Sequence, residues 1–161
     1  MKKLLGIVVL GLLCCNVGFA ELITLKKCYI IDFIQSDTDE TYSFNSWEEQ
    51  KASPRIFAEE NLFTLDTVVE TITATTYFKN SYIKRMKEVN IIQPKINKQI
   101  YKIVDLGGNV ATAEYFSNDP DIKKKKIDLD FVSNIAYLYD HIIIGNTDVK
   151  TSVTVQCSRQ K

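Results

Sequence analysis

The most regular feature of the chain is an alternation of apolar and polar residues, which is the pattern of a β-strand with one buried face. The alternation is clearest in residues 126–131 (KIDLDF) and recurs in residues 151–157 (TSVTVQC). Residues 67–78 (TVVETITATTYF) are rich in β-branched Thr, Val and Ile, which suit a pleated surface. These segments predict a mainly β protein.

Short turn-like segments separate the alternating runs. They are residues 36–40 (SDTDE), 105–109 (DLGGN), 132–134 (VSN) and 145–148 (GNTD). Adjacent glycines and short polar stretches are typical of tight connections between neighbouring strands. We therefore expect a single-domain antiparallel meander of about eight to ten strands, closed into a barrel-like sheet.

Two segments depart from the strand pattern. Ser46 precedes Glu49 by three residues, which is a capping-box spacing, so we expect a short helix at 46–52 that ends before Pro54. Residues 81–92 (SYIKRMKEVNII) fit either a helix or a strand. Because their neighbours are β-rich, we predict a strand.

The first 20 residues have the organisation of an export signal. A short basic start, an apolar run and small residues at Gly18 and Ala20 predict cleavage between Ala20 and Glu21, which leaves one domain over 21–161. The apolar run is shorter than the roughly 20 residues that a spanning helix needs. The alternatives are an anchor that is never cut and lipidation at Cys15, although no Gly, Ala or Ser precedes Cys14 or Cys15.

The charge of the chain is balanced, with 20 basic and 20 acidic residues. Removing the signal takes away two lysines and no acid. A nucleic-acid-binding protein would carry a clustered basic excess, so we expect no nucleic-acid partner. The overall balance gives no attraction to an anionic membrane, and we expect no membrane span in the mature chain, which we take to be a monomer.

The mature chain has two cysteines, Cys28 and Cys157, one near each end. Export from the reducing cytosol would let them pair. A disulfide requires Cα atoms within about 7 Å, so the first and last strands would be neighbours and the bond would fasten the seam of a barrel. A sandwich with both strands in one sheet is the alternative. Strand phase places Cys28 on the wrong face unless a β-bulge lies at Lys26–Lys27, which we predict.

Catalytic and metal-binding patterns are sparse. His141 is the single histidine, and no known nucleophile, zinc or phosphate-loop motif occurs in the sequence. We predict no catalytic residue, no metal and no cofactor, hence a protein that is not an enzyme. An enzyme built on Asp128, Asp130 or His141 ranks last among the alternatives.

The remaining polar clusters have ordinary explanations. The acids of 37–40 and 119–121 fit solvated turns better than calcium loops. The basic run at 123–126 fits an exposed loop that neighbouring acids partly neutralise. Several aromatic residues fall in strand-like runs, where they would either line a ligand cavity or fill the barrel, and we favour filling: Tyr29, Phe33, Tyr101, Tyr115, Phe131, Tyr137 and Tyr139.

The signal MKKLLGIVVLGLL, the early LKKC, the IDLDF and IAYLY strands and the terminal VTVQC resemble small uncharacterised exported proteins of AT-rich marine alphaproteobacteria. That resemblance implies a periplasmic or secreted location and a β architecture, and no activity. A weaker resemblance is to periplasmic lysozyme-inhibitor barrels, which also carry an early cysteine and a disulfide-tied meander. Their Ser-Gly-rich inhibitory loop has no counterpart, since residues 105–115 (DLGGNVATAEY) differ too much.

These observations favour an exported, non-catalytic β-barrel that binds a small apolar molecule in the barrel or a periplasmic protein on a loop face. The alternatives are an envelope structural or interaction protein with a filled core, and a protein similar to the lysozyme inhibitors. A cavity would favour ligand binding, whereas a filled core with an exposed apolar patch would favour a structural role.

Overall fold

The computed structural model describes residues 21–38 and 40–160. The predicted export signal over residues 1–20, including Cys14, Cys15 and the cleavage position at Ala20, lies outside the described residues, so those predictions stay predictions.

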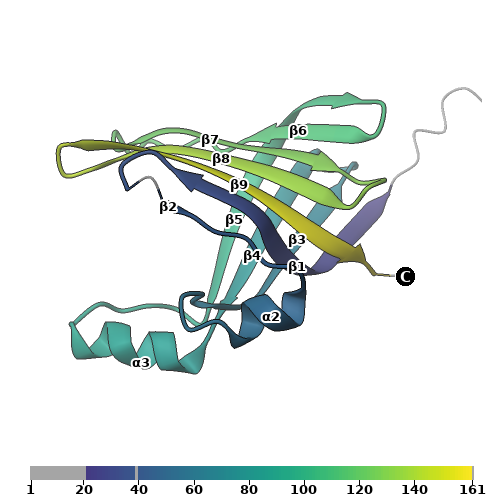
Figure 1. Ribbon diagram of the computed structural model, residues 1–161. Helices are drawn as coiled ribbons and strands as arrows, with labels where there is room; N and C mark the ends of the chain where they lie inside the picture. Colours follow the sequence, from purple (N-terminus) through teal and green to yellow (C-terminus); the bar gives the residue numbers. More distant parts are fainter. Residues whose placement is uncertain (1–20, 39, 161) are drawn as a thin grey trace, which may run out of the picture.

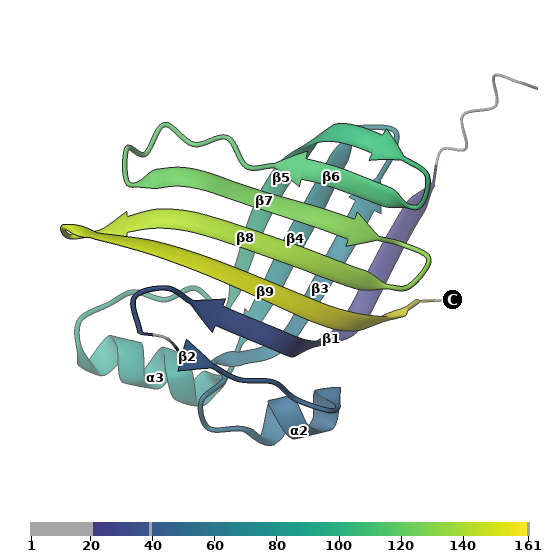
Figure 2. The same cartoon turned by 45° about the horizontal axis from the view of Figure 1, so that its top comes forward.

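The described chain forms a closed antiparallel barrel (Figures 1 and 2). Eight strands, β1 and β3 to β9, pair in sequence order, and β1 also pairs with β9, which closes the sheet. The short strand β2 pairs with the end of β1 outside this cycle. The strands are β1 (Leu22–Gln35), β2 (Glu40–Thr41), β3 (Ala58–Asp66), β4 (Thr71–Phe78), β5 (Ile96–Gly107), β6 (Val110–Glu114), β7 (Ile122–Asp130), β8 (Ile135–Ile144) and β9 (Thr147–Arg159). The predicted closed meander is confirmed.

The hydrophobic core fills one end of the barrel, which we call the filled end. The turns β3–β4, β5–β6 and β7–β8 lie there, as do the first residue of β1 and the last of β9 (Figure 2). Inward positions of all eight barrel strands contribute to it. The buried members of this core are Ile23, Leu25, Cys28, Phe63, Leu65, Ile72, Tyr101, Ala111, Ala113, Ile127, Leu129, Ala136, Val155 and Cys157. Alternation in KIDLDF and TSVTVQC thus identified the inward faces of β7 and β9.

Cys28 and Cys157 join β1 to β9 as a disulfide, with 2.12 Å between the two sulfur atoms. The β1–β9 ladder shifts register between Lys26 and Tyr29, and Lys27 has a φ of 50°. This irregularity brings both Leu25 and Cys28 to the interior, where each has no exposed surface. The predicted bulge and the predicted seam disulfide are both present.

Strand β1 pairs with β3 only over Leu22–Leu25, after which the two strands separate. The short helix α2 (Trp47–Ala52) packs beside both strands at this split. Its buried Gln50 accepts a hydrogen bond from the Ile30 amide at 2.6 Å and donates one to the Cys28 carbonyl at 3.3 Å. Gln50 therefore satisfies two backbone groups that the strand pairing leaves open.

Helix α2 begins as the sequence predicted. The Ser46 hydroxyl accepts a hydrogen bond from the Glu49 amide at 3.1 Å. The Glu49 carboxylate, however, accepts from the Asn45 amide at 2.8 Å and not from that of Ser46, so the capping box is displaced by one residue. The helix ends at Ala52, two residues before Pro54.

The predicted strand over residues 81–92 is wrong. Helix α3 (Asn80–Glu88) occupies most of this segment, and residues 89–95 return to β5 without regular structure. The residues of α3 include Lys, Arg, Met and Glu, which are good helix formers, and the β-rich neighbours had no influence on it. The segment lies outside the sheet, so its own propensity decided its conformation.

Candidate functional site

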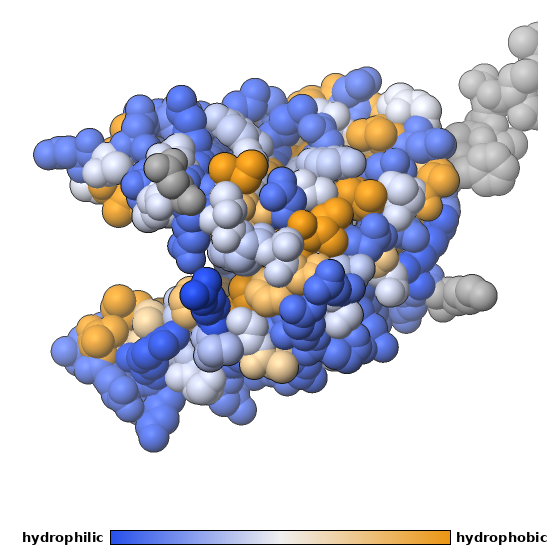
Figure 3. Space-filling view, viewed as in Figure 1, coloured by the Kyte–Doolittle hydropathy of each residue, from blue (hydrophilic) through white to orange (hydrophobic). Residues whose placement is uncertain are grey.

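A pocket of about 160 Å³ lies inside the barrel, next to the hydrophobic core of the filled end. It belongs to the opposite end, the mouth, where the β8–β9 turn and α3 are found (Figure 1). Figure 3 shows the surface hollowed between the strands β7 to β9 and the side of the molecule that carries α3. The lining comes from β1, β3, β4, β5, β8 and β9: Ile30, Asn61, Leu62, Phe63, Ala74, Thr75, Thr76, Asn97, Gln99, Tyr101, Leu138, Asp140, Val153 and Val155.

The lining is apolar at depth and polar toward the mouth. Strand direction places Phe63, Tyr101 and Val155 next to the core, whereas Asn97 and Asp140 lie nearer the strand ends at the mouth. The interior position of each follows from the ladders, in which paired residues share a face. Such a pocket can hold a small molecule with an apolar body and a polar head.

An ion pair lies within the barrel at the level of the pocket. Lys125 of β7 and Asp140 of β8 are cross-strand partners, with 3.1 Å between Nζ and Oδ2. The Lys125 side chain is only 12% exposed, whereas that of Asp140 is 34% exposed and lines the pocket. The two charges neutralise each other, so the ion pair adds no net charge to the pocket. The Asp140 carboxylate still offers the pocket a hydrogen-bond acceptor.

Two further hydrogen bonds fix polar groups of the lining. The Thr76 hydroxyl donates to the Asn61 side-chain carbonyl at 2.9 Å. The Tyr101 hydroxyl donates to Oε1 of Gln99 at 3.0 Å. Burial is the main reason that the pKa of Tyr101 is raised, and the nearby Asp140 and Tyr115 add to it. Tyr101 is therefore a neutral hydrogen-bond donor at physiological pH.

The basic run at 123–126 is part of strand β7, so the predicted loop is wrong. Three of its lysines form ion pairs: Lys124 with Glu114, Lys125 with Asp140, and Lys126 with Asp128. Lys125 points inward because it continues the phase of Ile127 and Leu129. The sequence contained that signal, since the alternation of KIDLDF extends back by one residue to Lys125.

Other pocket residues were missed in the sequence. Asp140 was noted only as the neighbour of His141, and Asn61, Thr76 and Gln99 lie in strands that contain no motif. They could have been found only from the register of the ladders, because the ladders decide which polar residues share the interior with Tyr101.

The aromatic residues divide between the two faces of the barrel. Tyr101 and Tyr115 lie inside, with ring centroids 5.6 Å apart, and Phe131 packs against the core. Phe33 also faces inward, because it pairs with inward-facing Val153. Its ring stacks on that of Tyr42, with 4.2 Å between ring centroids.

Three aromatic residues face outward, so the expectation that they lie in the interior is wrong. Tyr29 pairs with Gln156, Tyr137 with Asp128 and Tyr139 with Lys126, all on the outer face. The bulge before Tyr29 reverses the phase of β1, and the strand pattern alone did not show which face of β8 was buried. The interior is thus filled at one end and hollow at the other.

Asp128, Asp130 and His141 do not converge on one site. Asp128 lies on the outer face, with Lys126 at 2.8 Å and the Thr112 hydroxyl at 2.6 Å. His141 contacts Asp148 at 2.7 Å. Asp128 pairs with Tyr137 in the ladder, and His141 is four positions further along β8. Four strand residues span roughly 13 Å.

Hydrogen bonds engage the acids on this face. Asp130 accepts from the amides of Val132 and Ser133 in the β7–β8 turn, both at 3.0 Å, and these bonds, that of Ser133 foremost, lower its pKa. The hydrogen bond with His141 lowers the pKa of Asp148. Their contacts are those of turn and surface residues.

The turn acids show the same local use. Asp37 accepts from the Gln35 side chain at 2.7 Å, and Asp119 accepts from the Asp121 amide at 3.0 Å. In residues 21–38 and 40–160, no three His, Cys, Asp or Glu side chains are grouped as a metal site would require. No helix in this part of the chain is both long and apolar enough to cross a membrane.

No protein-family model matches the sequence, and neither a curated protein sequence nor a solved structure is significantly similar to it.

Proposed function

We propose that this protein is an exported, non-catalytic β-barrel that binds one small, mainly apolar molecule at the mouth of the barrel. The observation that carries the proposal is the division of the interior into a filled end and a pocket of about 160 Å³. A barrel with a purely structural role would gain stability from filling that space, because each missing packing contact is a loss of dispersion energy.

The size of the pocket limits the ligand. A cavity of about 150 Å³ is known to accommodate benzene. The deep part of the pocket therefore suits one ring or a short alkyl chain, and the rest of the ligand would extend toward the mouth. Phe63, Leu138 and Val153 supply the apolar contact surface for that body.

The polar groups favour a neutral head group. Asp140 is already paired with Lys125, so a ligand carboxylate would have to displace it or lie beside it unpaired. The Gln99 and Asn97 amides and the Asp140 carboxylate instead suit a hydroxyl or an uncharged amide, which can both donate and accept hydrogen bonds.

Export and oxidation support this assignment. A disulfide between Cys28 and Cys157 is suited to an oxidising compartment, and the signal-like first 20 residues predict delivery to one. These two features support our proposal of a periplasmic or secreted location.

Binding is tested by titrating the oxidised protein with indole, benzyl alcohol and hexanol while recording amide chemical shifts. We expect shifts centred on the pocket strands, and we expect the Ala74→Phe variant to abolish them because its ring would occupy the pocket. Thr73→Phe, on the outer face of the same strand, is the matched control and should bind as the wild type does. Absence of pocket-centred shifts with all three compounds would overturn the proposal.

A second candidate function is binding of a protein partner on the outside of β5. The large apolar side chains exposed on this strand include Ile100 at 60%, which pairs with outward-facing Thr73, and Val104 at 50%, which lies at the register shift of the β5–β6 ladder. Single exposed apolar residues are common, whereas neighbouring ones can mark an interaction surface. A photo-cross-linking residue at 104 should capture a partner in the cell envelope, whereas the same residue at Val132 should not.

A further inference from the structure

Helix α3 projects from the barrel and is attached along one side only. Tyr82 stacks on Phe57 with 4.6 Å between ring centroids and contacts Phe78 at 5.4 Å. None of the α3 residues is buried. Its other sides are therefore available to a partner.

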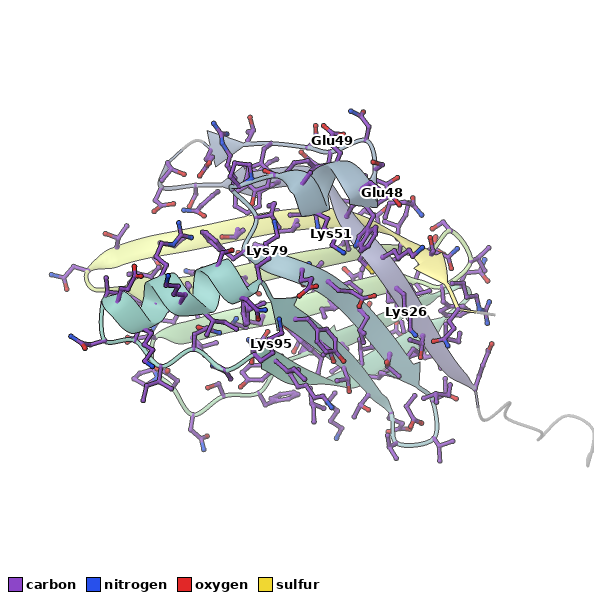
Figure 4. The ribbon with its side chains drawn as sticks, turned by 90° about the horizontal axis from the view of Figure 1, so that it is seen from below. Lys26, Glu48, Glu49, Lys51, Lys79 and Lys95 are labelled. Carbon is purple, nitrogen blue, oxygen red and sulfur yellow. A yellow bond between two sulfur atoms is a disulfide. The ribbon has the colours of Figure 1, made fainter. Side chains whose placement is uncertain are left out.

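Two lysines fix the base of α3. Lys79 donates to the carbonyls of Lys51 and Ser53 at the end of α2, at 2.7 and 2.9 Å. Lys95 donates to the Phe78 carbonyl and the Asn80 side chain on the other side of the first turn, at 2.8 and 2.9 Å (Figure 4). The orientation of the helix is thus set at its start, and its far end is held away from the barrel.

The far end of α3 exposes apolar side chains to solvent. Val89 is 58% exposed, Ile91 51% and Ile92 97%. Apolar surface is visible on the side of the molecule that carries α3 (Figure 3). Ile83 and Lys87 line a groove of about 420 Å³ together with residues 90–93. We call the surface made by Val89, Ile91 and Ile92 the α3 tip. Removing such side chains from water is favourable, so a protruding group of three is a strong candidate for contact with an apolar phase.

The charge around the α3 tip is positive. Residues 84–92 contain three basic side chains and one acidic one, in a chain whose basic and acidic residues balance. Lys84 and Lys87 form no ion pair with any described residue, and the Arg85 guanidinium lies over the Phe57 ring at 5.4 Å without a carboxylate partner there. By contrast, three consecutive lysines of β7 are each paired with an acid. The balanced total charge therefore conceals a local basic excess.

We propose that α3 and its tip dock the protein on a membrane surface that contains anionic lipid. Apolar side chains at a protruding tip would enter the headgroup region, and Lys84, Arg85 and Lys87 would approach the lipid phosphates. Neither signal is strong by itself, since stable peripheral binding generally needs both an apolar and an electrostatic contribution. A negatively charged lipid surface matches both, because it supplies anions and apolar depth together.

Docking through α3 would bring the mouth of the barrel to the membrane surface. Strand β4 ends at Phe78 and β5 begins at Ile96, on either side of α3, and Thr76 and Asn97 of these strands line the pocket. A ligand could then pass between the lipid phase and the pocket without crossing bulk water. This consequence depends on the proposed ligand binding, whereas the docking itself does not.

The test is flotation of the oxidised, exported protein with vesicles of equimolar phosphatidylcholine and phosphatidylglycerol. We expect binding at low ionic strength that weakens as salt is added, and no binding to vesicles of phosphatidylcholine alone. Lys84→Glu/Lys87→Glu should bind at least about thirty-fold more weakly, because each lost basic side chain contributes roughly a factor of five and the new carboxylates are repelled by the anionic surface. Ile92→Asp should weaken binding through the apolar contribution.

Matched controls separate the α3 surface from total charge and from apolar content. Lys102→Glu/Arg159→Glu makes the same charge change at exposed positions near the filled end, away from α3, and should leave flotation unchanged. Val68→Asp removes a residue that is 66% exposed in the β3–β4 turn at the filled end and should also have no effect. Circular dichroism of each variant checks that the barrel is intact.

Two results would overturn the docking proposal. Wild-type protein that stays in the soluble fraction with anionic vesicles at low salt would show that α3 does not bind lipid. Equal flotation of Lys84→Glu/Lys87→Glu and the wild type would assign any lipid binding to another face. Loss of ligand-induced shifts with flotation retained would reject ligand binding and leave the docking proposal standing.

Discussion

Lys125 Nζ and Asp140 Oδ2 lie 3.1 Å apart inside the barrel, as cross-strand partners in the β7–β8 ladder. The ammonium group is the more enclosed of the two, since 12% of its side chain is exposed against 34% for Asp140. An enclosed lysine needs its counter-ion, because an unpaired charge in a poorly solvated place is costly. This pair links the packing of the barrel to the polar side of the pocket.

Removing the carboxylate should destabilise the barrel. Asp140→Asn leaves Lys125 without a counter-ion, and we expect about 1–3 kcal/mol lower free energy of unfolding in urea titrations, less than for a fully buried pair because Asp140 is partly solvated. The double variant Lys125→Met/Asp140→Leu should lie within about 1 kcal/mol of the wild type. Glu59→Gln breaks an exposed pair of the same 3.1 Å length and should cost under about 1 kcal/mol. Equal losses for Asp140→Asn and Glu59→Gln would contradict this account.

The seam disulfide should contribute substantially to stability. Cys28 and Cys157 are 129 residues apart, and we expect the Cys28→Ala/Cys157→Ala variant to lose roughly 2–5 kcal/mol of unfolding free energy. The physical reason is the larger conformational freedom of the unlinked unfolded chain. Reducing the wild-type protein with dithiothreitol should give the same urea midpoint as the double variant. A midpoint that does not move on reduction would show that the β1–β9 ladder holds the seam by itself.

The closed barrel could be predicted because local strand patterns and one long-range restraint, the cysteine pair, agree. Alternation identified the buried faces of β7 and β9, and the two terminal cysteines required β1 and β9 to be neighbours. The bulge at Lys26–Lys27 was predictable because Leu25 and Cys28 had to reach the same interior across an odd spacing. Each of these steps used a local pattern together with one long-range restraint.

The pocket and α3 could not be predicted in the same way. Whether Asn61, Gln99 and Asp140 share the interior depends on the register of separate ladders, and no local pattern in the sequence sets that register. Residues 81–92 had no long-range restraint, and their β-rich neighbours suggested a strand although the segment does not join the sheet. The interior role of Lys125 was overlooked because a run of four lysines resembles a solvated loop.

Alkaline titration should reveal the burial of Tyr101. Its pKa is raised in the folded protein above the ordinary value near 10, so between the unfolded and folded pKa the native state holds a proton that the unfolded state has lost. Stability should therefore be unaffected below pH about 10 and should fall as pH rises above it. Tyr101→Phe should reduce this alkaline loss and cost about 1 kcal/mol at neutral pH through the lost bond to Gln99. Absorbance at alkaline pH reports tyrosinate directly, and titration of all tyrosines near pH 10 would refute the assignment.

Gln50 offers a pH-dependent test of the split between β1 and β3. Gln50→Leu removes the acceptor of the Ile30 amide and the donor to the Cys28 carbonyl, so we expect about 1–3 kcal/mol lower unfolding free energy. Gln50→Glu keeps the acceptor, but its carboxylate would lie buried beside the Cys28 carbonyl, which raises the pKa of the new side chain above its unfolded value.

The sign of the effect follows from proton linkage. Between the unfolded and the folded pKa of residue 50, the native Gln50→Glu protein holds more protons than the unfolded chain, so its stability should rise as pH falls through that interval. The protonated carboxyl would then donate to Cys28 as the amide does. In urea titrations at decreasing pH, the unfolding free energy of Gln50→Glu should approach that of the wild type. The difference between Gln50→Leu and the wild type should stay constant. Parallel curves for both variants would mean that Gln50 acts through packing alone.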